Sequence, residues 1–135
     1  MPQFIKRFLE WISLKEKIDT SKAKAPKFKE GEIWMIHFGE NVGFESSGRH
    51  AQFHRPVIIL HKFNSHLFYG LPTSTKLKPN NPFYTEFIFK NKPQSAMISQ
   101  VRSLSSKRLH YKLGELPNSD ISNLRKEFLS LFDKK

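Results

Sequence analysis

Arginine, histidine and hydroxyl side chains gather where two apolar segments of the chain begin or end. His54 and Arg55 directly precede the apolar run PVIIL, and Thr73 and Ser74 close the next apolar segment, HLFYGLPTS. A guanidinium can bind two oxygens of one phosphate through its planar fork, and a hydroxyl can donate to a phosphate oxygen without adding charge. These residue types predict a phosphate site at the edge of a core.

Each of these residues also has an ordinary structural interpretation. Arg55 could form a surface ion pair, and Thr73, Ser74 and Thr75 could end a strand with turn-forming hydroxyls. In an extended strand Thr73 and Thr75 share one face while Ser74 points to the other, so we do not expect both faces to reach one phosphate. We therefore favour Thr73 over Ser74.

Histidine is the side chain best suited to move protons near neutral pH, whereas arginine hardly deprotonates. His54, next to Arg55, is therefore a candidate acid or base. His37, His61 and His66 lie in or beside predicted strands, where a lone histidine is more often structural or exposed. Because no histidine pair stands with carboxylates at a recognisable metal-ligand spacing, the sequence predicts no metal.

Composition limits the partners. The 135 residues include 23 Lys and Arg against 12 Asp and Glu, a net charge of +11. This excess favours a polyanionic partner, namely nucleic acid, an anionic membrane or an acidic protein, over a merely lysine-rich surface. The absence of cysteine excludes disulfides and thiolate chemistry. No apolar run approaches the ~18 residues of a membrane span, and no signal-peptide pattern is present, so we expect a cytoplasmic protein.

Apolar periodicity divides the chain into an N-terminal helix with a linker, residues 1–28, and one domain, residues 29–135. The helix is predicted over residues 3–18, and we expect it to pack on the domain or on a partner subunit rather than on a membrane. A polar, lysine-rich linker follows it. The apolar side chains at helical spacing are Phe4, Ile5, Phe8, Leu9 and Ile12.

The domain alternates short strands with loops. A long loop, residues 39–54, follows the first strand and is of the kind that often carries function. The last segment predicts a helix that is capped by Asn118 or Ser119 and has one apolar face. Short strands with a closing helix predict a small, strongly bent sheet or barrel. Strands are predicted at 32–38, 56–63, 66–74, 83–89, 95–104 and 111–116, a helical turn at 105–109, and the helix face at Ile121, Leu124, Phe128, Leu131 and Phe132.

The order of these motifs resembles the MazF/PemK family of toxins from bacterial toxin–antitoxin pairs. The resemblance rests on GEIW, VG with a following glutamate, RPVIIL, PTS, SQVRSLSSKRL and the C-terminal helix, in that order over residues 31–132. It implies a mainly β fold with α, an SH3-like small barrel of the CcdB/MazF type with a C-terminal helix. The N-terminal amphipathic helix is an addition to that fold.

The same resemblance implies a homodimeric endoribonuclease that cuts single-stranded RNA by transesterification. Such an enzyme uses no metal or other cofactor and leaves a 2′,3′-cyclic phosphate. A cognate antitoxin with an acidic tail blocks it, and the pair contacts DNA only through that antitoxin.

Residue by residue, the resemblance implies that Arg55 is catalytic and that Thr73 is catalytic or contacts the phosphate. Ser74 matches a serine of PemK-like members, and His54 a histidine of some members. Glu45 resembles the loop glutamate, which could orient Arg55 or help proton transfer. An ordinary solvated glutamate is an equally open interpretation.

Further residues could contact RNA. The added segment SGRHAQF places Arg49 and Phe53 near the predicted site, where basic and aromatic groups suit phosphate binding and base stacking. Gln100 and Arg102 could contact RNA or only hydrogen-bond within the sheet. Ser99 stands where PemK-like members have an acid. That departure keeps open an RNA-binding module without catalysis. A non-enzymatic toxin of the CcdB type, which resembles the same barrel and inhibits gyrase, is a further alternative, but it needs no arginine–threonine site, so Arg55 and Thr73 together favour the nuclease.

Overall fold

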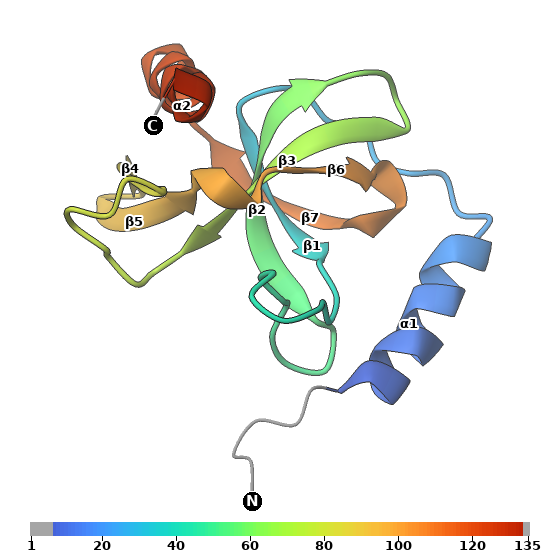
Figure 1. Ribbon diagram of the computed structural model, residues 1–135. Helices are drawn as coiled ribbons and strands as arrows, with labels where there is room; N and C mark the ends of the chain where they lie inside the picture. The colour runs from blue at the N-terminus through green and yellow to red at the C-terminus, as the bar shows by residue number, and fades with distance from the viewer. Residues whose placement is uncertain (1–6, 134–135) are drawn as a thin grey trace, which may run out of the picture.

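Strand β1 (Glu32–His37) lies in the interior of the sheet, between β2 (His54–Lys62) and β7 (Leu109–Glu115). The computed structural model describes residues 7–133. All pairings are antiparallel, and the strand order is β4-β5-β3-β2-β1-β7, with β6 also paired to β3. The sheet bends into a small barrel (Figure 1), as the sequence predicted. The other strands are β3 (Leu67–Ser74), β4 (Tyr84–Phe89), β5 (Lys92–Met97) and β6 (Arg102–Ser105).

Side chains of β1 and β2 are buried on both faces of the sheet, because two apolar clusters flank these strands. Ile33 and Ile58 belong to one cluster, which α2 (Asn118–Ser130) completes. Trp34 and Val57, their neighbours along the chain, belong to the other cluster. Since successive strand residues point to opposite faces, this arrangement explains the continuous apolar run of β2.

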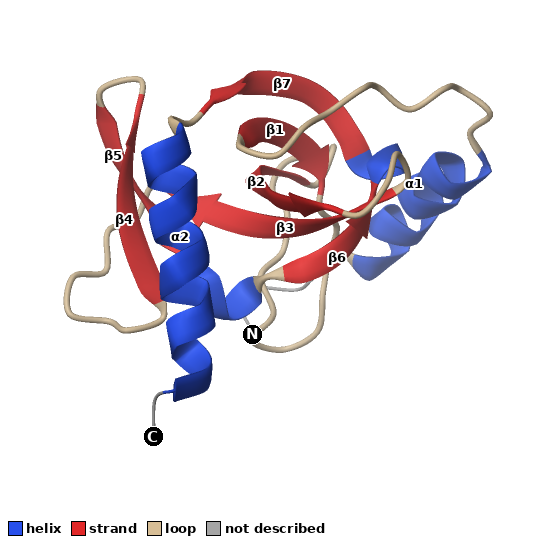
Figure 2. Ribbon diagram, turned by 90° about the horizontal axis from the view of Figure 1, so that it is seen from above, coloured by secondary structure: helices blue, strands red, loops and turns tan. Residues whose placement is uncertain are grey.

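The two helices lie on opposite sides of the barrel in both views (Figures 1 and 2). Helix α2 buries Ile121 and Leu124, as predicted, and partly covers Phe128 and Leu131. Phe132, predicted on the same face, is exposed because the last residues form a separate 3₁₀ turn. At the other end of the helix, the N-cap is Pro117 rather than the predicted Asn118 or Ser119. Within residues 7–133, the helices are too short or too polar to cross a membrane.

Helix α1 (Phe8–Thr20) contacts the barrel by a different residue than predicted. Phe8, Leu9 and Ile12 are exposed, whereas Trp11 is 5% exposed. The indole of Trp11 packs on the ring of Phe53, with the ring centroids 5.5 Å apart. The predicted apolar residues Phe4 and Ile5 lie outside the described residues.

The strand predicted over residues 95–104 is divided in the structure. It comprises β5, a 3₁₀ turn at Ile98–Gln100, and β6. The reason is that β3 pairs with β5 near its end, at Thr73 and Ser74, and with β6 near its start. The two pairings differ in register, since Gly70 lies opposite Arg102 but Thr73 lies opposite Ala96, and the residues of the 3₁₀ turn take up this offset.

The loop between β1 and β2 folds back on itself. The amides of Phe38 and Gly39 donate to the carbonyl of Phe53, and the amide of Gly48 donates to the carbonyl of Gly39. Arg49 and His54 exchange two backbone hydrogen bonds of 2.8 Å. A Cβ atom on Gly48 would lie 1.8 Å from the carbonyl oxygen of Phe53, so only glycine fits there.

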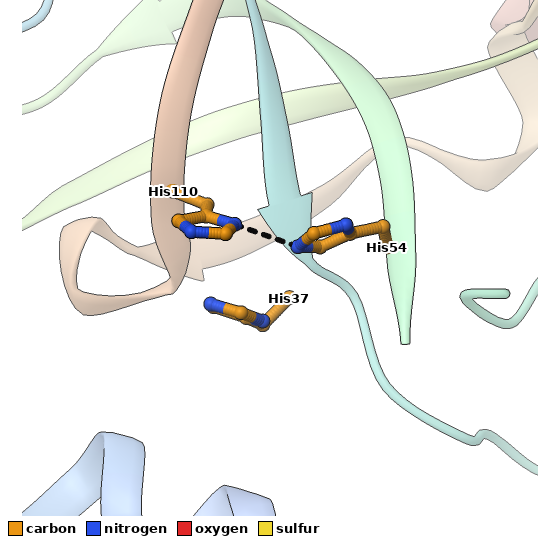
Figure 3. Close-up of side chains that lie close together, drawn as sticks. All are labelled: His37, His54 and His110. Atoms are coloured by element: carbon orange, nitrogen blue, oxygen red, sulfur yellow. Dashed lines mark hydrogen bonds between the residues drawn. The ribbon is translucent and has the colours of Figure 1, made fainter. Parts of the chain in front are cut away.

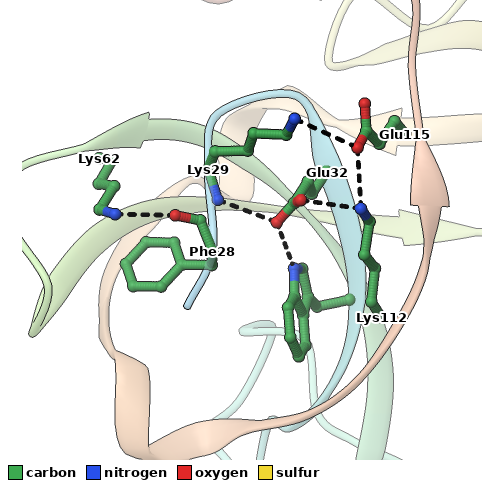
Figure 4. A network of polar contacts seen from close by, with 7 residues as sticks. Phe28, Lys29, Glu32, Lys62, Lys112 and Glu115 are labelled. Carbon is green, nitrogen blue, oxygen red and sulfur yellow. Dashed lines mark hydrogen bonds and ion pairs between the residues drawn. The ribbon is translucent and has the colours of Figure 1, made fainter. Parts of the chain in front are cut away.

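Glu32 is a buried carboxylate at the start of β1 (Figure 4). Its Oε1 accepts hydrogen bonds from the backbone N–H of Lys29 and from Nε1 of Trp34, and its Oε2 lies 2.9 Å from Nζ of Lys112. Burial raises the pKa of Glu32, but these hydrogen bonds and the charge of Lys112 outweigh burial, so the pKa lies below its ordinary value. The ionised form therefore stabilises the fold.

We expect Glu32→Gln to reduce the free energy of unfolding by about 1–3 kcal/mol at neutral pH, because an amide N–H would then face buried donors. Glu115→Gln is the matched control, since Glu115 also pairs with Lys112 but is half exposed. Urea unfolding of both variants measures the difference, and an equal loss in both would contradict a special role for Glu32.

The pH dependence of this contribution follows from the lowered pKa. The unfolded state binds a proton at higher pH than the folded state, so the contribution is present above the ordinary pKa and is lost as pH falls through the folded pKa. Urea unfolding from pH 7 to pH 3 should show a smaller acid loss in Glu32→Gln than in wild type. The same acid loss in both proteins would argue against this interpretation.

A second expectation concerns the loop. Gly48→Ala should displace the backbone of Phe53 and open the Arg49–His54 hydrogen bonds, lowering the free energy of unfolding by roughly 1–3 kcal/mol. Gly43→Ala is the control, because a Cβ there meets nothing within 4 Å, although the φ of +58° carries some strain. Amide hydrogen exchange of residues 49 and 54 should accelerate in Gly48→Ala alone. Unchanged exchange in that variant would contradict the steric argument.

Candidate active site

Arg55 is held by the backbone at the start of β2. Its Nε donates to the carbonyl of Ser47 at 2.9 Å, and its Nη1 donates to the carbonyl of Thr73 at 3.0 Å. One carbonyl belongs to the loop and the other to the end of β3. The guanidinium is therefore fixed in one orientation, with N–H groups left for a further acceptor.

No carboxylate pairs with Arg55 within residues 7–133, so the surface ion pair considered as its alternative role is absent there. Burial lowers the pKa of Arg55, and the nearby charge of Arg49 lowers it further. Two positive groups thus share one small region, and the carbonyl dipoles only partly compensate the charge of Arg55. An anion bound between them would relieve the repulsion.

The cavity next to Arg55 has a polar lining. Thr73 is buried, and its Oγ1 donates to the carbonyl of Pro56 at 3.1 Å. Ser74 is partly exposed, and its Oγ accepts from the backbone N–H of Lys76. The hydroxyls of Thr73 and Ser74 thus bond to different partners, although both residues line the cavity, so the expectation that only one of them reaches a phosphate stays a prediction. The residues lining the cavity are Arg49, His54, Arg55, Pro56, Thr73, Ser74, Thr75 and Gln94.

Gln94 joins this cavity without any signal in the sequence. It lies on β5, next to Ser95, which pairs with Ser74 at the end of β3. Its amide offers both a donor and an acceptor to a ligand. A polar residue in a predicted strand is too common to single out, and only the pairing of β5 with β3 places this one.

His54 lines the cavity and also belongs to a group of three histidines, with His37 and His110 (Figure 3). Its Nε2 is 2.7 Å from Nδ1 of His110. Burial lowers the pKa of His54 to about 4, and the charges of His37, His110 and His50 contribute. His54 is therefore neutral at neutral pH and can accept a proton there.

Glu45 does not form an ion pair with Arg55, so the predicted orienting contact is absent. The carbonyls of Ser47 and Thr73 orient the guanidinium instead. Glu45 accepts a hydrogen bond from the backbone N–H of Val42 and lines a second cavity. Ser99, at the position where PemK-like members have an acid, lines the same cavity.

Gln100 and Arg102 bind the loop. The amide of Gln100 accepts from the backbone N–H of Ser46 and donates to the carbonyl of Phe44. Arg102 donates to the side-chain oxygen of Asn41 at 3.4 Å. Both residues therefore shape the loop, and both also line the second cavity, where a ligand can reach them.

Phe53 is 1% exposed and cannot stack on a base. It is buried because the chain turns at Phe53 with a φ of +53° and directs the ring toward Trp11. Phe44, in the same loop, is the aromatic residue that is fully exposed. The prediction that Phe53 stacks on a base is therefore wrong, because its ring is buried.

Comparisons with known proteins identify the family and the fold. A family model described as a PemK-like, MazF-like toxin of type II toxin–antitoxin systems matches residues 29–132. A comparison with curated proteins gives no match.

Two solved structures from Deinococcus radiodurans share the fold. MazF (Form-I) is 20% identical with a TM-score of 0.64, covering 79% of this chain and 97% of that chain. MazE–MazF (Form-II) is 18% identical with a TM-score of 0.58, covering 80% and 97%. The barrel and its C-terminal helix therefore have the MazF fold. Since the family model spans most of the chain, the protein belongs to the PemK-like, MazF-like toxins of type II toxin–antitoxin systems.

Proposed function

We propose that the protein is an endoribonuclease that cleaves single-stranded RNA in the cytoplasm at the cavity beside Arg55. The observation that carries this proposal is a half-buried guanidinium with no carboxylate partner in the described chain, fixed by two carbonyls beside hydroxyl groups. Such a group binds a phosphate diester in a defined orientation. The positive charge of the chain attracts the RNA backbone.

The reaction is a transesterification. The ribose 2′-oxygen loses its proton and bonds to phosphorus, the bond from phosphorus to the 5′-oxygen breaks, and that oxygen takes up a proton. The products are a 2′,3′-cyclic phosphate and a free 5′-hydroxyl. Arg55 stabilises the extra negative charge that the phosphorane carries in the transition state, an effect that is large where water is excluded.

Polar neighbours supply the remaining contacts. His54 is neutral at neutral pH and is the lining residue that can accept the proton of the 2′-hydroxyl. Ser74 offers a hydroxyl group to the phosphate, Thr73 would do so once its O–H turns from the carbonyl of Pro56, and Arg49 offers a second positive charge. No step in this scheme requires a metal ion, because charge stabilisation comes from the guanidinium.

The partners follow from the family. One solved structure from Deinococcus radiodurans contains MazE together with MazF. Since the family consists of toxins of type II toxin–antitoxin systems, we infer that this chain also has a cognate antitoxin. An acidic segment of that antitoxin would suit the charge of +11 and could occupy the Arg55 cavity in place of RNA. We further infer a homodimer, with DNA contacted only through the antitoxin.

The proposal is tested by incubating purified protein with long single-stranded RNA in excess EDTA. We expect discrete fragments with cyclic-phosphate ends, identified by mass. Arg55→Ala and Arg55→Lys should each lower kcat/KM by at least about 10²-fold, because lysine keeps the charge but loses the planar fork. Thr73→Val should lower kcat/KM more than Thr73→Ser, which keeps the hydroxyl.

Arg125→Ala is the matched control, because Arg125 lies on α2 and pairs with Glu30, outside the cavity. Urea unfolding of each variant separates loss of fold from loss of chemistry. Fragments that persist in folded Arg55→Ala would place the chemistry elsewhere. RNA binding without cleavage by wild type would indicate a binding module, and neither activity would direct the search to a protein target such as gyrase.

A separate expectation concerns stacking of bases on the loop. Phe44→Ala should weaken binding of a short single-stranded RNA by about 1–3 kcal/mol if one base stacks on this exposed ring. Phe132→Ala is the control, since Phe132 is also exposed but lies beyond α2. Fluorescence anisotropy measures both, and equal affinities would remove Phe44 from the RNA-binding surface.

A further inference from the structure

Three histidines from three neighbouring strands meet at one end of the barrel (Figure 3). His37 ends β1, His54 begins β2 directly opposite it, and His110 lies near the start of β7. Their ring centroids form a nearly equilateral triangle with sides of 5.0, 4.8 and 4.8 Å. We call His37, His54 and His110 the histidine cluster.

A bulge in β7 brings His110 into the cluster. Met35 pairs with Tyr111 and Ile36 pairs with Leu109, so His110 is an extra residue without a partner on β1. Such a bulge turns a side chain away from the regular alternation of the strand. The bulge, rather than the regular strand pairing, therefore places His110 next to His37 and His54.

The hydrogen bonds leave lone pairs directed into the cluster. Nδ1 of His37 lies 2.9 Å from the carbonyl of Gln52 and must donate to it, because a carbonyl only accepts. The lone pair of a neutral His37 is therefore on Nε2. Nδ1 of His110 and Nε2 of His54 share one proton across 2.7 Å. A carbonyl that fixes the tautomer of a histidine is the usual second partner of a metal-binding histidine.

We propose that the histidine cluster binds one divalent transition-metal ion. One ring nitrogen from each histidine lies within 4.8 Å of the others. In a tetrahedral zinc site with Zn–N of about 2.0–2.1 Å, ligand nitrogens are about 3.4 Å apart. The nitrogen–nitrogen distances within the cluster range from 2.7 Å to at most 4.8 Å, on both sides of that value. Rotation of the rings is therefore enough to bring the three nitrogens to the spacing of a zinc site. The metal would take the place of the proton that His54 and His110 share, and that proton would move to the outer nitrogen of the ring that carried it.

Three neutral imidazoles select the class of metal. Zinc, copper, nickel and cobalt bind imidazole nitrogen well, whereas magnesium and calcium prefer oxygen ligands. A fourth position remains for water or another ligand, because His110 is exposed and His37 borders a hollow under the linker. The nearby cations Lys107 and Arg108 weaken the site, so we expect micromolar rather than tighter affinity.

Occupancy would also affect the Arg55 cavity, and this consequence rests on the proposed function. His54 lines that cavity. A metal on Nε2 of His54 takes one lone pair and leaves a proton on Nδ1, so His54 can no longer accept the proton of the 2′-hydroxyl. Metal binding would therefore slow RNA cleavage.

The test is isothermal titration of the full, untagged chain with zinc chloride and, separately, with magnesium chloride. We expect one zinc ion per chain at micromolar affinity and no binding of magnesium. His110→Gln should weaken zinc binding at least tenfold. The matched control is His66→Gln, which removes an exposed histidine of the β2–β3 turn and should leave affinity unchanged.

Two further readouts locate the ion. In NMR spectra of the ring nitrogens, zinc should shift the signals of the three cluster histidines and leave those of His61 and His66 in place. The proposal would be overturned if the titration showed no zinc binding, or if His110→Gln bound zinc as tightly as the wild type. If zinc binds but slows cleavage equally in wild type and His110→Gln, the metal site stands and its effect on His54 is wrong. If the protein cleaves no RNA at all, the binding result still decides the metal site.

Discussion

The contact between the Arg55 guanidinium and two backbone carbonyls is the constraint on which the site depends. The carbonyls of Ser47 and Thr73 lie in the loop and at the end of β3, so one side chain joins three parts of the fold. Carbonyl dipoles attract the guanidinium but do not neutralise it. Because the group is half buried, its charge acts on a ligand through less water than a surface arginine does. This combination of fixed orientation and uncompensated charge supports the proposal that the cavity binds an anion.

The loop that supplies Ser47 is held by its own contacts. Gly48 allows the backbone of Phe53 to approach closely, and Gln100 bonds to both sides of the loop turn. Trp11 of α1 covers Phe53 from outside. The N-terminal helix therefore supports the same loop that positions Arg55, although it lies outside the barrel.

Much of the fold and part of the site could be predicted from the sequence, and the remainder depends on contacts between distant residues. The strands followed from their apolar runs, and Arg55 and Thr73 were found because they adjoin those runs. The sequence could not show that Phe53 would turn inward, because its φ of +53° depends on how the loop closes. Nor could it show that His37, His54 and His110 meet, because a bulge, rather than any sequence spacing, brings His110 to the other two.

His54 connects the two chemical features of the molecule. Its Nε2 shares a proton with His110, so the state of the histidine cluster decides which nitrogen of His54 carries the lone pair. If Nε2 donates to His110, Nδ1 is a base. If Nε2 accepts from His110 or binds a metal, Nδ1 carries a proton and acts as a donor. Under the proposed function, a phosphate beside Arg55 would therefore meet either a proton acceptor or a hydrogen-bond donor at His54, and the contact with His110 of β7 would decide which.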